Sequence, residues 1–287
     1  MEITWSTKLY CLIGNPIDKS LSPIIHNNIF KILNENSIYL AFNVEEKNLK
    51  NLINGFKSMN VQGFNVTIPY KKKIIDYLDD ISPEANIIGA VNTVKNQNGK
   101  LIGYNTDGEG FLRTFYDENI DLKNKNILIL GAGGAAYGIG VSLGLKEIKS
   151  ISIGNRNLEK AYLLQKRINK INSNIPVTVD NLSLNNIEKE NIHIIINSTS
   201  IGMYPMENLV PIELNGFSKD TIIYDIVYKP QNTQLIEIAK LKGFKTLGGL
   251  SMLLNQAILS QKIWLDLRED DLNRLKSIEG KLSTYLK

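Results

Sequence analysis

The sequence has very few of the residues that form covalent crosslinks or metal clusters. Its 287 residues include one cysteine, Cys11, and two histidines. A single cysteine cannot form a disulfide within the chain or supply the several thiolates of a cysteine-based metal cluster. We therefore expect no metal site, and a reducing compartment is the simplest location for the protein.

Long apolar runs and a strong excess of one charge are also absent. No uninterrupted apolar stretch approaches the roughly 18 residues that span a bilayer, and residues 1–5 lack the pattern of a secretion signal. The net charge is +4, from 33 lysines and arginines against 29 aspartates and glutamates spread along the chain. This balance gives no support for a nucleic-acid partner and is compatible with small anionic ligands. We expect a cytoplasmic protein that binds neither membranes nor nucleic acid.

The sequence does contain two series of alternating strand-like and helix-like segments, an alternation typical of mostly parallel sheets. The first series has apolar runs at residues 8–13, 38–44 and 61–68, and an Asn98-Gly99 step that predicts a tight hairpin turn. The second series has strand-like runs at residues 126–130, 148–153, 177–179, 192–196 and 221–224.

This organisation predicts an α/β fold with two domains, since 287 residues are many for a single core. We expect an N-terminal α/β domain over residues 1–106 and a doubly wound, Rossmann-like domain over residues 107–254. The segment from Leu250 onward has an apolar helical face. We therefore expect a C-terminal helix that returns to the first domain, which residues from about 255 to 287 complete.

A glycine-rich turn follows the strand-like run at residues 127–130. Its sequence is Gly131-Ala132-Gly133-Gly134-Ala135-Ala136, a G-x-G-x-x-A pattern with a helix predicted after it. The first glycine permits a tight turn, the second lets the backbone approach a pyrophosphate, and the small sixth residue lets the helix pack on its strand. The helix N-terminus adds amides and a positive dipole. The turn predicts dinucleotide binding, against the alternative of a glycine-rich packing turn.

The residues about 20 positions further on indicate which dinucleotide binds. Sites that prefer NAD usually have an acidic residue there, which binds the ribose hydroxyls, whereas this sequence has Asn155-Arg156. A guanidinium can pair with a 2′-phosphate and stack on adenine. The sequence therefore favours NADP(H) over NAD, and the alternative is an arginine that ends a strand at the surface.

Polar residues gather in four segments of the first domain. Ser20 and Ser22 lie beside a predicted helix start, where two hydroxyls can bind a carboxylate, unless Ser22 only caps the helix. Lys71 follows a strand, and a lysine at the carboxyl edge of an open α/β sheet faces the ligand cleft. Asn92 lies on a strand, and Asp107 lies at another helix start. Taken singly, Lys71 is an ordinary solvated lysine and Asp107 an N-cap.

These segments, in this order, resemble the shikimate dehydrogenase family. The resemblance runs from Leu12 to about Gln261 and covers nearly the whole chain. It rests on seven ordered blocks, at residues 14–27, 65–71, 89–94, 103–110, 197–203, 225–233 and 248–256. Seven blocks in the right order make a chance match untenable.

The resemblance implies a role for each residue at a matching position. The first domain becomes the substrate-binding and catalytic domain, with Lys71 as the catalytic lysine and Asp107 as its partner. Substrate-binding roles fall on Ser20 and Ser22 for a carboxylate, Tyr228 near it, and Thr67, Lys71, Asn92, Asp107 and Gln256 for the ring. Cofactor-binding roles fall on Gly131, Ala132, Gly133, Gly134, Ala135, Asn155, Arg156, Thr199, Ile226, Gly249 and Met252.

Three positions need a separate interpretation. The family's adenosine-phosphate clamp usually continues with a threonine, which is Asn157 here and slightly weakens the preference for NADP. His193 stands where the family often has aspartate, and we expect it to pack at a strand or lie at the surface. We expect His26 to secure the first loop.

The resemblance implies an oxidoreductase that reversibly reduces 3-dehydroshikimate to shikimate with NADPH, in aromatic amino-acid (chorismate) biosynthesis. One alternative is an NAD-dependent quinate/shikimate dehydrogenase, which Ser20 and Asn155-Arg156 argue against. Another is a non-catalytic protein that binds the same acid and regulates a partner. Lys71 and Asp107 argue against this one, because sites and not folds assign function. The resemblance permits a monomer or a homodimer.

Overall fold

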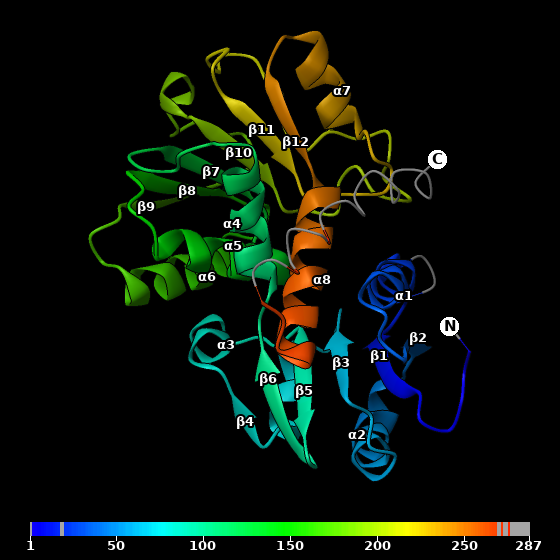
Figure 1. The fold of residues 1–287 in the computed structure, drawn as a ribbon. Helices are drawn as coiled ribbons and strands as arrows, with labels where there is room; N and C mark the ends of the chain where they lie inside the picture. The colour runs from blue at the N-terminus through cyan, green and yellow to red at the C-terminus, as the bar shows by residue number, and fades with distance from the viewer. Residues whose placement is uncertain (1, 18–19, 269–270, 272–274, 276–287) are drawn as a thin grey trace. The chain divides into compact units, whose positions relative to one another are not determined.

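The computed structural model describes residues 2–17, 20–268, 271 and 275. They divide into two compact units (Figure 1). The first comprises the residues up to Thr106 together with those from Leu254 on, and the second comprises Asp107–Leu253. Each unit contains a six-stranded sheet with helices packed on it. The predicted α/β class is confirmed.

The sheet of the first unit is mixed, with strand order β2-β1-β3-β5-β6-β4. Its strands are β1 (Lys8–Gly14), β2 (Ser37–Asn43), β3 (Gly63–Val66), β4 (Asp80–Ile81), β5 (Thr93–Gln97) and β6 (Lys100–Tyr104). Strands β1, β2 and β3 are parallel, as expected. The β5–β6 hairpin reverses the chain, so β5 pairs antiparallel with both β3 and β6.

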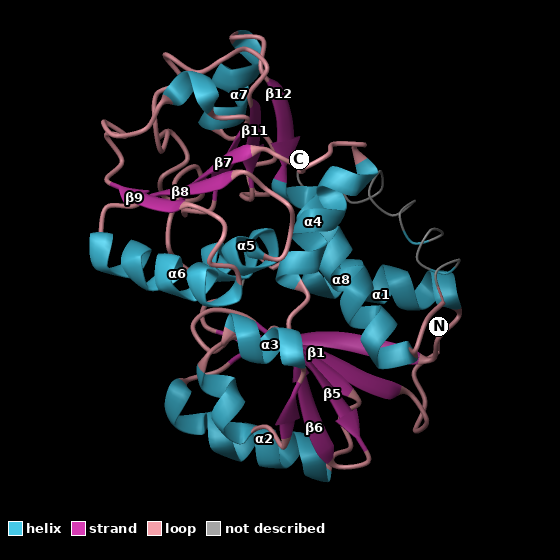
Figure 2. Ribbon diagram, turned by 90° about the vertical axis from the view of Figure 1, so that its left-hand side faces the viewer, coloured by secondary structure: helices cyan, strands magenta, loops and turns pink. Residues whose placement is uncertain are grey.

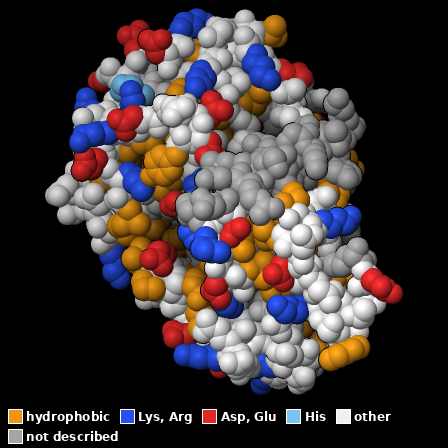
Figure 3. Space-filling view, viewed as in Figure 1, with side chains coloured by type: hydrophobic (Ala, Val, Ile, Leu, Met, Phe, Trp, Pro, Cys, Tyr) orange, Lys and Arg blue, Asp and Glu red, His pale blue; other side chains and the backbone are white. Residues whose placement is uncertain are grey.

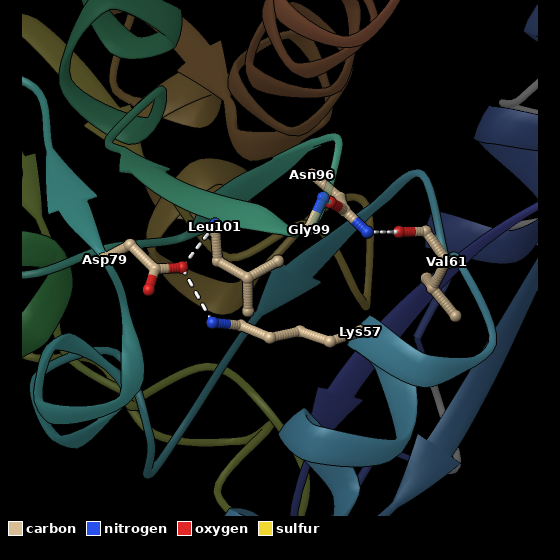
Figure 4. A network of polar contacts seen from close by, with 6 residues as sticks. All are labelled: Lys57, Val61, Asp79, Asn96, Gly99 and Leu101. Atoms are coloured by element: carbon tan, nitrogen blue, oxygen red, sulfur yellow. Dashed lines mark hydrogen bonds and ion pairs between the residues drawn. The ribbon is translucent and has the colours of Figure 1, made fainter.

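The hairpin turns at the predicted Asn-Gly step. Asn98 and Gly99 have φ values of 53° and 90°, the left-handed conformation that a tight two-residue turn requires. Asn96 fixes the turn from both ends of its carboxamide (Figure 4). Its Oδ1 accepts a hydrogen bond from the Gly99 amide, and its Nδ2 donates to the Val61 carbonyl, both at 2.8 Å.

Helices cover both faces of this sheet because the side chains of β1 alternate between them. Cys11 and Ile13 pack in the cluster that includes helix α2 (Leu49–Ser58). Tyr10 and Leu12 pack in the cluster that includes α1 (Ser22–Leu33) and α8 (Gly249–Leu265). The predicted return of a C-terminal helix to the first unit is thus confirmed. The short helix α3 (Pro83–Ile88) precedes β5.

The sheet of the second unit is entirely parallel, with strand order β12-β11-β10-β7-β8-β9. Its strands are β7 (Asn126–Leu130), β8 (Ser150–Gly154), β9 (Val177–Asp180), β10 (Ile194–Asn197), β11 (Ile222–Asp225) and β12 (Lys245–Gly248). This order is that of a doubly wound dinucleotide fold. In that fold the first three strands extend the sheet in one direction, and the next three extend it in the other direction, beginning beside the first strand. The reversal lies between β7 and β10, and ligands bind at the carboxyl ends of strands beside it.

Alternating residues of β7 build two cores in this unit. Ile127 and Ile129 pack with helices α4 (Asp107–Asp117), α5 (Gly134–Gly144) and α6 (Leu158–Ile171). Leu128 and Leu130 pack on the other face, with α7 (Gln234–Leu241). Figure 2 shows α5 and α6 on one side of the sheet and α7 on the other.

In Figure 3, acidic and basic side chains are intermingled over the face shown. Among the helices that the structure describes, none is long and apolar enough to cross a membrane.

Candidate active site

The glycine-rich turn of the second unit joins β7 to α5. Gly131 has a φ of 105°, and a Cβ there would lie 2.9 Å from Ser198 Oγ, so both conformation and space require glycine. Gly133 and Gly134 are exposed, and a Cβ on either would have no atom within 4 Å. Ala136, in the first turn of the helix after this loop, is fully buried in the core that also includes Ile127 and Ile129. The turn therefore has Gly131 where the backbone is tight, Gly133 where a ligand can approach, and Ala136 where the helix packs closely, as the sequence predicted.

The open space above this turn fits a phosphate group. Gly133 is the N-cap of α5 and has no side chain to bond the first amides of the helix. Those amides point along the helix axis and carry the positive end of its dipole. The turn therefore offers unshielded donors, with no side chain in the way of an approaching pyrophosphate.

The loop after β8 presents an arginine on a fixed backbone. Asn155 Nδ2 donates to the Asn157 carbonyl at 2.7 Å, and Asn157 Oδ1 accepts from the Lys160 amide at 3.0 Å, which caps α6. Arg156 between them is exposed and makes no ion pair within the part of the chain that the structure describes. Asn157 therefore has a capping role, which leaves Arg156 as the cation of this loop.

The remaining predicted cofactor residues follow the carboxyl ends of neighbouring strands. Thr199 follows β10, Ile226 follows β11, and Gly249 and Met252 follow β12. A Cβ on Gly249 would lie 2.1 Å from the Ile226 carbonyl oxygen, so this approach requires glycine. The structure thus brings these residues to the same sheet edge as Gly131.

A buried acid that sequence reasoning missed supports this edge. Asp225 is fully buried, and its Oδ1 accepts from Asn197 Nδ2 and the Val227 amide, both at 3.0 Å. Its Oδ2 accepts from Thr233 Oγ1 at 2.6 Å. Burial raises the pKa of Asp225, and these hydrogen bonds oppose that shift. Asn197 in turn accepts from Thr199 Oγ1 at 2.7 Å. Asp225 therefore organises the loops after β10 and β11.

In the first unit, Ser20 and Ser22 lie together at the start of α1. Ser20 Oγ donates to Ser22 Oγ at 3.2 Å and accepts from the Ser22 amide at the same distance. The N-cap is Leu21, which has no side-chain cap bond, so the interpretation of Ser22 as a helix cap is wrong. Pro23 lies in the first turn, as predicted. Two hydroxyls thus meet at a helix N-terminus.

Backbone hydrogen bonds fix the loop that carries Thr67 and Lys71. The Thr67 amide donates to the Ile13 carbonyl at 2.9 Å, and the Thr67 carbonyl accepts from the Tyr70 amide at 2.9 Å. The half-buried Lys71 accepts at its own carbonyl from the Val91 amide at 2.7 Å. Because Val91 precedes Asn92, this bond places the backbone of Lys71 beside the segment that carries the predicted amide.

A buried polar network holds Asn92. Its Nδ2 donates to Thr106 Oγ1 at 2.9 Å and lies 3.5 Å from Gln256 Oε1. Its Oδ1 accepts from the Thr106 amide at 2.8 Å. Asp107 comes directly after Thr106 and is 8% exposed. The structure therefore brings Asn92 and Gln256 together and fixes the chain next to Asp107. Tyr228 and Met252 belong to the second unit, and burial raises the pKa of Tyr228.

The two histidines have structural roles. His26 is fully buried, stacks on Tyr39 with 4.2 Å between ring centroids, and has its Nδ1 2.9 Å from Gln261 Nε2. It therefore fastens α8, and the prediction that it secures the first loop is wrong. His193, directly before β10, accepts at Nδ1 from the Asn126 amide of β7 at 3.1 Å, so it packs at a strand as expected. Over the described residues, no group of three or more histidine, cysteine, aspartate or glutamate side chains is placed to hold a metal ion.

Comparison with known proteins identifies relatives for both units. Residues 12–94 match the family described as the shikimate dehydrogenase substrate binding domain, and residues 115–230 match the family described as shikimate / quinate 5-dehydrogenase. A shikimate dehydrogenase (NADP⁺) of Methanococcus maripaludis is 45% identical over 282 residues, which cover 98% of this chain and 100% of the relative.

Solved structures with similar folds have the same family name as the sequence relatives. A shikimate dehydrogenase in complex with NADP⁺ is 39% identical, with a TM-score of 0.87 over 96% of this chain and 97% of the other. A shikimate 5-dehydrogenase of Listeria monocytogenes, in complex with shikimate and NAD, is 37% identical. Its TM-score is 0.89 over 97% of this chain and 98% of the other.

Proposed function

The chain belongs to the shikimate dehydrogenase family, and we propose that it reversibly reduces 3-dehydroshikimate to shikimate with NADPH, in aromatic amino-acid biosynthesis. The observation that carries the proposal is that one chain contains both the groups for a dinucleotide cofactor and the polar groups for a hydroxylated acid. The second unit has an open dinucleotide turn and an exposed Arg156 at a β8 loop. The first unit has Lys71 beside the network of Asn92 and Gln256.

The predicted cofactor residues offer groups that suit the phosphates of NADP(H). The amides from Ala132 to Ala135, at the α5 N-terminus, would hold the pyrophosphate, and Arg156 with Asn155 would hold the 2′-phosphate of the adenosine. Thr199, Ile226, Gly249 and Met252 line the carboxyl edge of the strands beside the switch point, where the nicotinamide end binds in this fold. When bound, NADPH supplies the hydride.

The substrate is a small carboxylic acid with several ring hydroxyls, and the predicted residues offer matching groups. Ser20 and Ser22 donate to the carboxylate at the start of α1, and the family resemblance assigns Tyr228 to the same group. Thr67, Asn92 and Gln256 supply a hydroxyl and two amides, which both donate and accept and so suit hydroxyl groups. Asp107 accepts from a further ring hydroxyl.

Lys71 and Asp107 carry the polar part of the reaction. As the ring carbonyl is reduced, negative charge develops on its oxygen, and that oxygen gains a proton. The Lys71 ammonium stabilises the developing charge and holds a proton at Nζ for transfer. The Asp107 carboxylate is its partner, as the family resemblance implies, and orients this ammonium. Backbone hydrogen bonds fix the loop of Lys71, and the Asn92 network fixes the chain next to Asp107.

A comparison of four rates tests the proposal. We expect oxidation of shikimate with NADP⁺ to exceed both the rate with NAD⁺ and the rate with quinate. The NAD⁺ measurement matters because the Listeria relative was crystallised with NAD. Faster oxidation of quinate with NAD⁺ would support a quinate/shikimate dehydrogenase instead. Shikimate binding without turnover of either nicotinamide would support a regulatory protein.

We also propose that the enzyme works in the cytoplasm as a monomer or homodimer. The supporting observation for the compartment is Cys11, a lone cysteine fully buried in the first unit. Fractionation of cells and light scattering of the purified protein test these two statements. Recovery outside the cytoplasm, or an assembly larger than a dimer, would contradict them.

A further inference from the structure

A serine on α8 lies at the centre of the polar network in the first unit. Ser260 is fully buried, one helical turn after Gln256. Its Oγ lies 2.8 Å from Thr93 Oγ1, 3.1 Å from Asn65 Nδ2 and 3.4 Å from Thr106 Oγ1. It also donates to the Gln256 carbonyl at 3.0 Å. One hydroxyl therefore connects α8 to β3, to β5 and to the segment before α4.

The partners of Ser260 hold both ends of the Asn92 carboxamide. Thr93 Oγ1 donates to Asn92 Oδ1 at 3.0 Å. Thr106 accepts from Asn92 Nδ2 at 2.9 Å and donates from its amide to Oδ1 at 2.8 Å. The oxygen and nitrogen of this amide cannot exchange places without loss of these bonds. Ser260 contacts both threonines, so it supports the orientation of Asn92 without touching it.

The hydrogen bonds around Ser260 can be directed in few alternative ways. Ser260 and Thr93 each have one hydroxyl proton, and Asn65 Nδ2 donates toward Ser260, Thr93 and the Asn92 carbonyl. In a buried site such bonds polarise one another, and an unpaired group is costly. Removal of the Ser260 hydroxyl therefore changes the hydrogen bonds that its partners make with one another, in addition to the bonds that are lost.

We propose that Ser260 is a positioning residue for substrate recognition. Through Thr93 and Thr106 it holds the Asn92 carboxamide, and through its place on α8 it keeps Gln256 within reach of that amide. Both amides then meet the ring hydroxyls in one orientation. This inference rests on the proposed function, because it assigns Asn92 and Gln256 to the ring of shikimate. Ser260 acts only through these residues.

The test compares Ser260→Ala with Ser142→Ala. Ser142 is also a buried helical serine, but it lies on α5 in the second unit, outside this network. For Ser260→Ala we expect a rise of about five- to tenfold in KM for shikimate, the equivalent of one lost hydrogen bond. The kcat changes less than this KM, and KM for NADP⁺ stays within about twofold, since the cofactor residues lie in the other unit. Ser142→Ala leaves KM for shikimate unchanged.

Two further measurements separate positioning from loss of stability. Thr93→Val keeps the side-chain shape without the hydroxyl, and Thr93→Ser keeps the hydroxyl. We expect only Thr93→Val to raise KM for shikimate, and its effect combined with Ser260→Ala to be less than additive. We also expect the wild-type enzyme to have a lower kcat/KM for a shikimate analogue that lacks one ring hydroxyl than for shikimate, and Ser260→Ala to make this ratio smaller.

The outcomes distinguish this inference from the proposed function. A folded Ser260→Ala enzyme with wild-type KM for shikimate overturns the role of Ser260. If that variant does not fold, equal KM values for Thr93→Val and Thr93→Ser overturn it instead. Wild-type enzyme that does not turn over shikimate contradicts the proposed function, and this inference with it.

Discussion

Lys71 and Lys72 are neighbours in the sequence, but their surroundings differ. Lys71 is half-buried and its carbonyl accepts a hydrogen bond from the Val91 amide, directly before Asn92, whereas Lys72 is exposed. We expect Lys71→Ala to reduce kcat on the order of a thousandfold, the size of a lost acid–base and electrostatic contribution. The KM for shikimate changes far less, because other groups bind the acid. Steady-state rates with Lys72→Ala as the matched control check this, and near-normal turnover of Lys71→Ala would remove Lys71 from the mechanism.

His26 makes the stability of the first unit depend on pH. Full burial lowers the pKa of His26 from its ordinary 6.5 to about 3. Between these two values the unfolded chain binds a proton that the folded chain does not, so the free energy of unfolding falls as pH falls. The contribution is complete above about pH 6.5 and decreases by roughly 1 kcal/mol per pH unit below it.

Urea unfolding at pH 7 and pH 4.5 measures this effect. His26→Phe keeps an aromatic ring against Tyr39 but cannot titrate. We expect the wild-type protein to lose more stability than His26→Phe over this pH range, even though the variant is less stable at pH 7 for want of the Gln261 contact. Equal losses in both proteins would exclude His26 as the titrating group.

Residue roles that depend on the local chain were predictable, and those that depend on distant partners were not. Gly131 needs a left-handed φ at a turn, which the G-x-G-x-x-A pattern already indicates. Ser260 lies on a helix, and its side-chain partners Asn65, Thr93 and Thr106 are more than 150 positions away in the sequence. His26 likewise contacts Gln261, which is 235 positions away in the sequence. The local sequence could not reveal this partner, so the prediction that His26 secures the first loop was wrong.

At the scale of elements, the approach of β12 and α8 to β11 depends on one glycine. A methyl on Gly249 would lie 2.1 Å from the Ile226 carbonyl oxygen, a distance that no side-chain movement relieves. We expect Gly249→Ala to lower the free energy of unfolding by about 1–3 kcal/mol, since an overpacked site must shift its backbone. It also raises KM for NADP⁺, because Ile226 and Gly249 both belong to the cofactor edge.

Gly55→Ala is the control for this variant. Gly55 lies inside α2, and its added Cβ would have only the flexible end of Met59 within 4 Å, at 4.0 Å. Alanine is favoured over glycine in a helix by roughly 0.5–1 kcal/mol, so the melting temperature rises and KM stays unchanged. If Gly249→Ala also stabilises the protein, the close approach at Ile226 does not constrain the fold.

Element prediction succeeded where the apolar pattern was strong. The run at residues 126–130 coincides with β7, and the helix after Asp107 coincides with α4. Strand β12 was missed because Lys245-Thr246-Leu247-Gly248 has a single buried apolar side chain, Leu247. It pairs with β11 by its backbone, and a pattern of side chains cannot reveal that. The edge strand β4 has only two residues and gives no periodic signal.

At the scale of the whole molecule, a chain segment distant in sequence completes the first unit. Trp264 on α8 is 5% exposed, and its Nε1 donates to the Val94 carbonyl on β5 at 2.9 Å. A Cβ on Gly63 of β3 would lie 2.4 Å from the same nitrogen, so this strand has glycine where the indole packs. The indole therefore packs closely on β3 and bonds to β5, so the stability of residues 63–97 depends on α8.

This link predicts that one substitution on α8 loosens the first sheet selectively. Trp264→Phe removes the indole donor and part of the buried ring, at a cost of about 1–3 kcal/mol. Amide hydrogen exchange measured by mass spectrometry should then quicken in β3 and β5 and stay unchanged in β7 and β8, which pack in a separate core. Trp5→Phe is the matched control, because Trp5 is the other of the two tryptophans and is 98% exposed. Equal quickening in β7 and β8 would mean that α8 supports both units alike, and no quickening in β3 would mean that the indole is not what holds the first sheet.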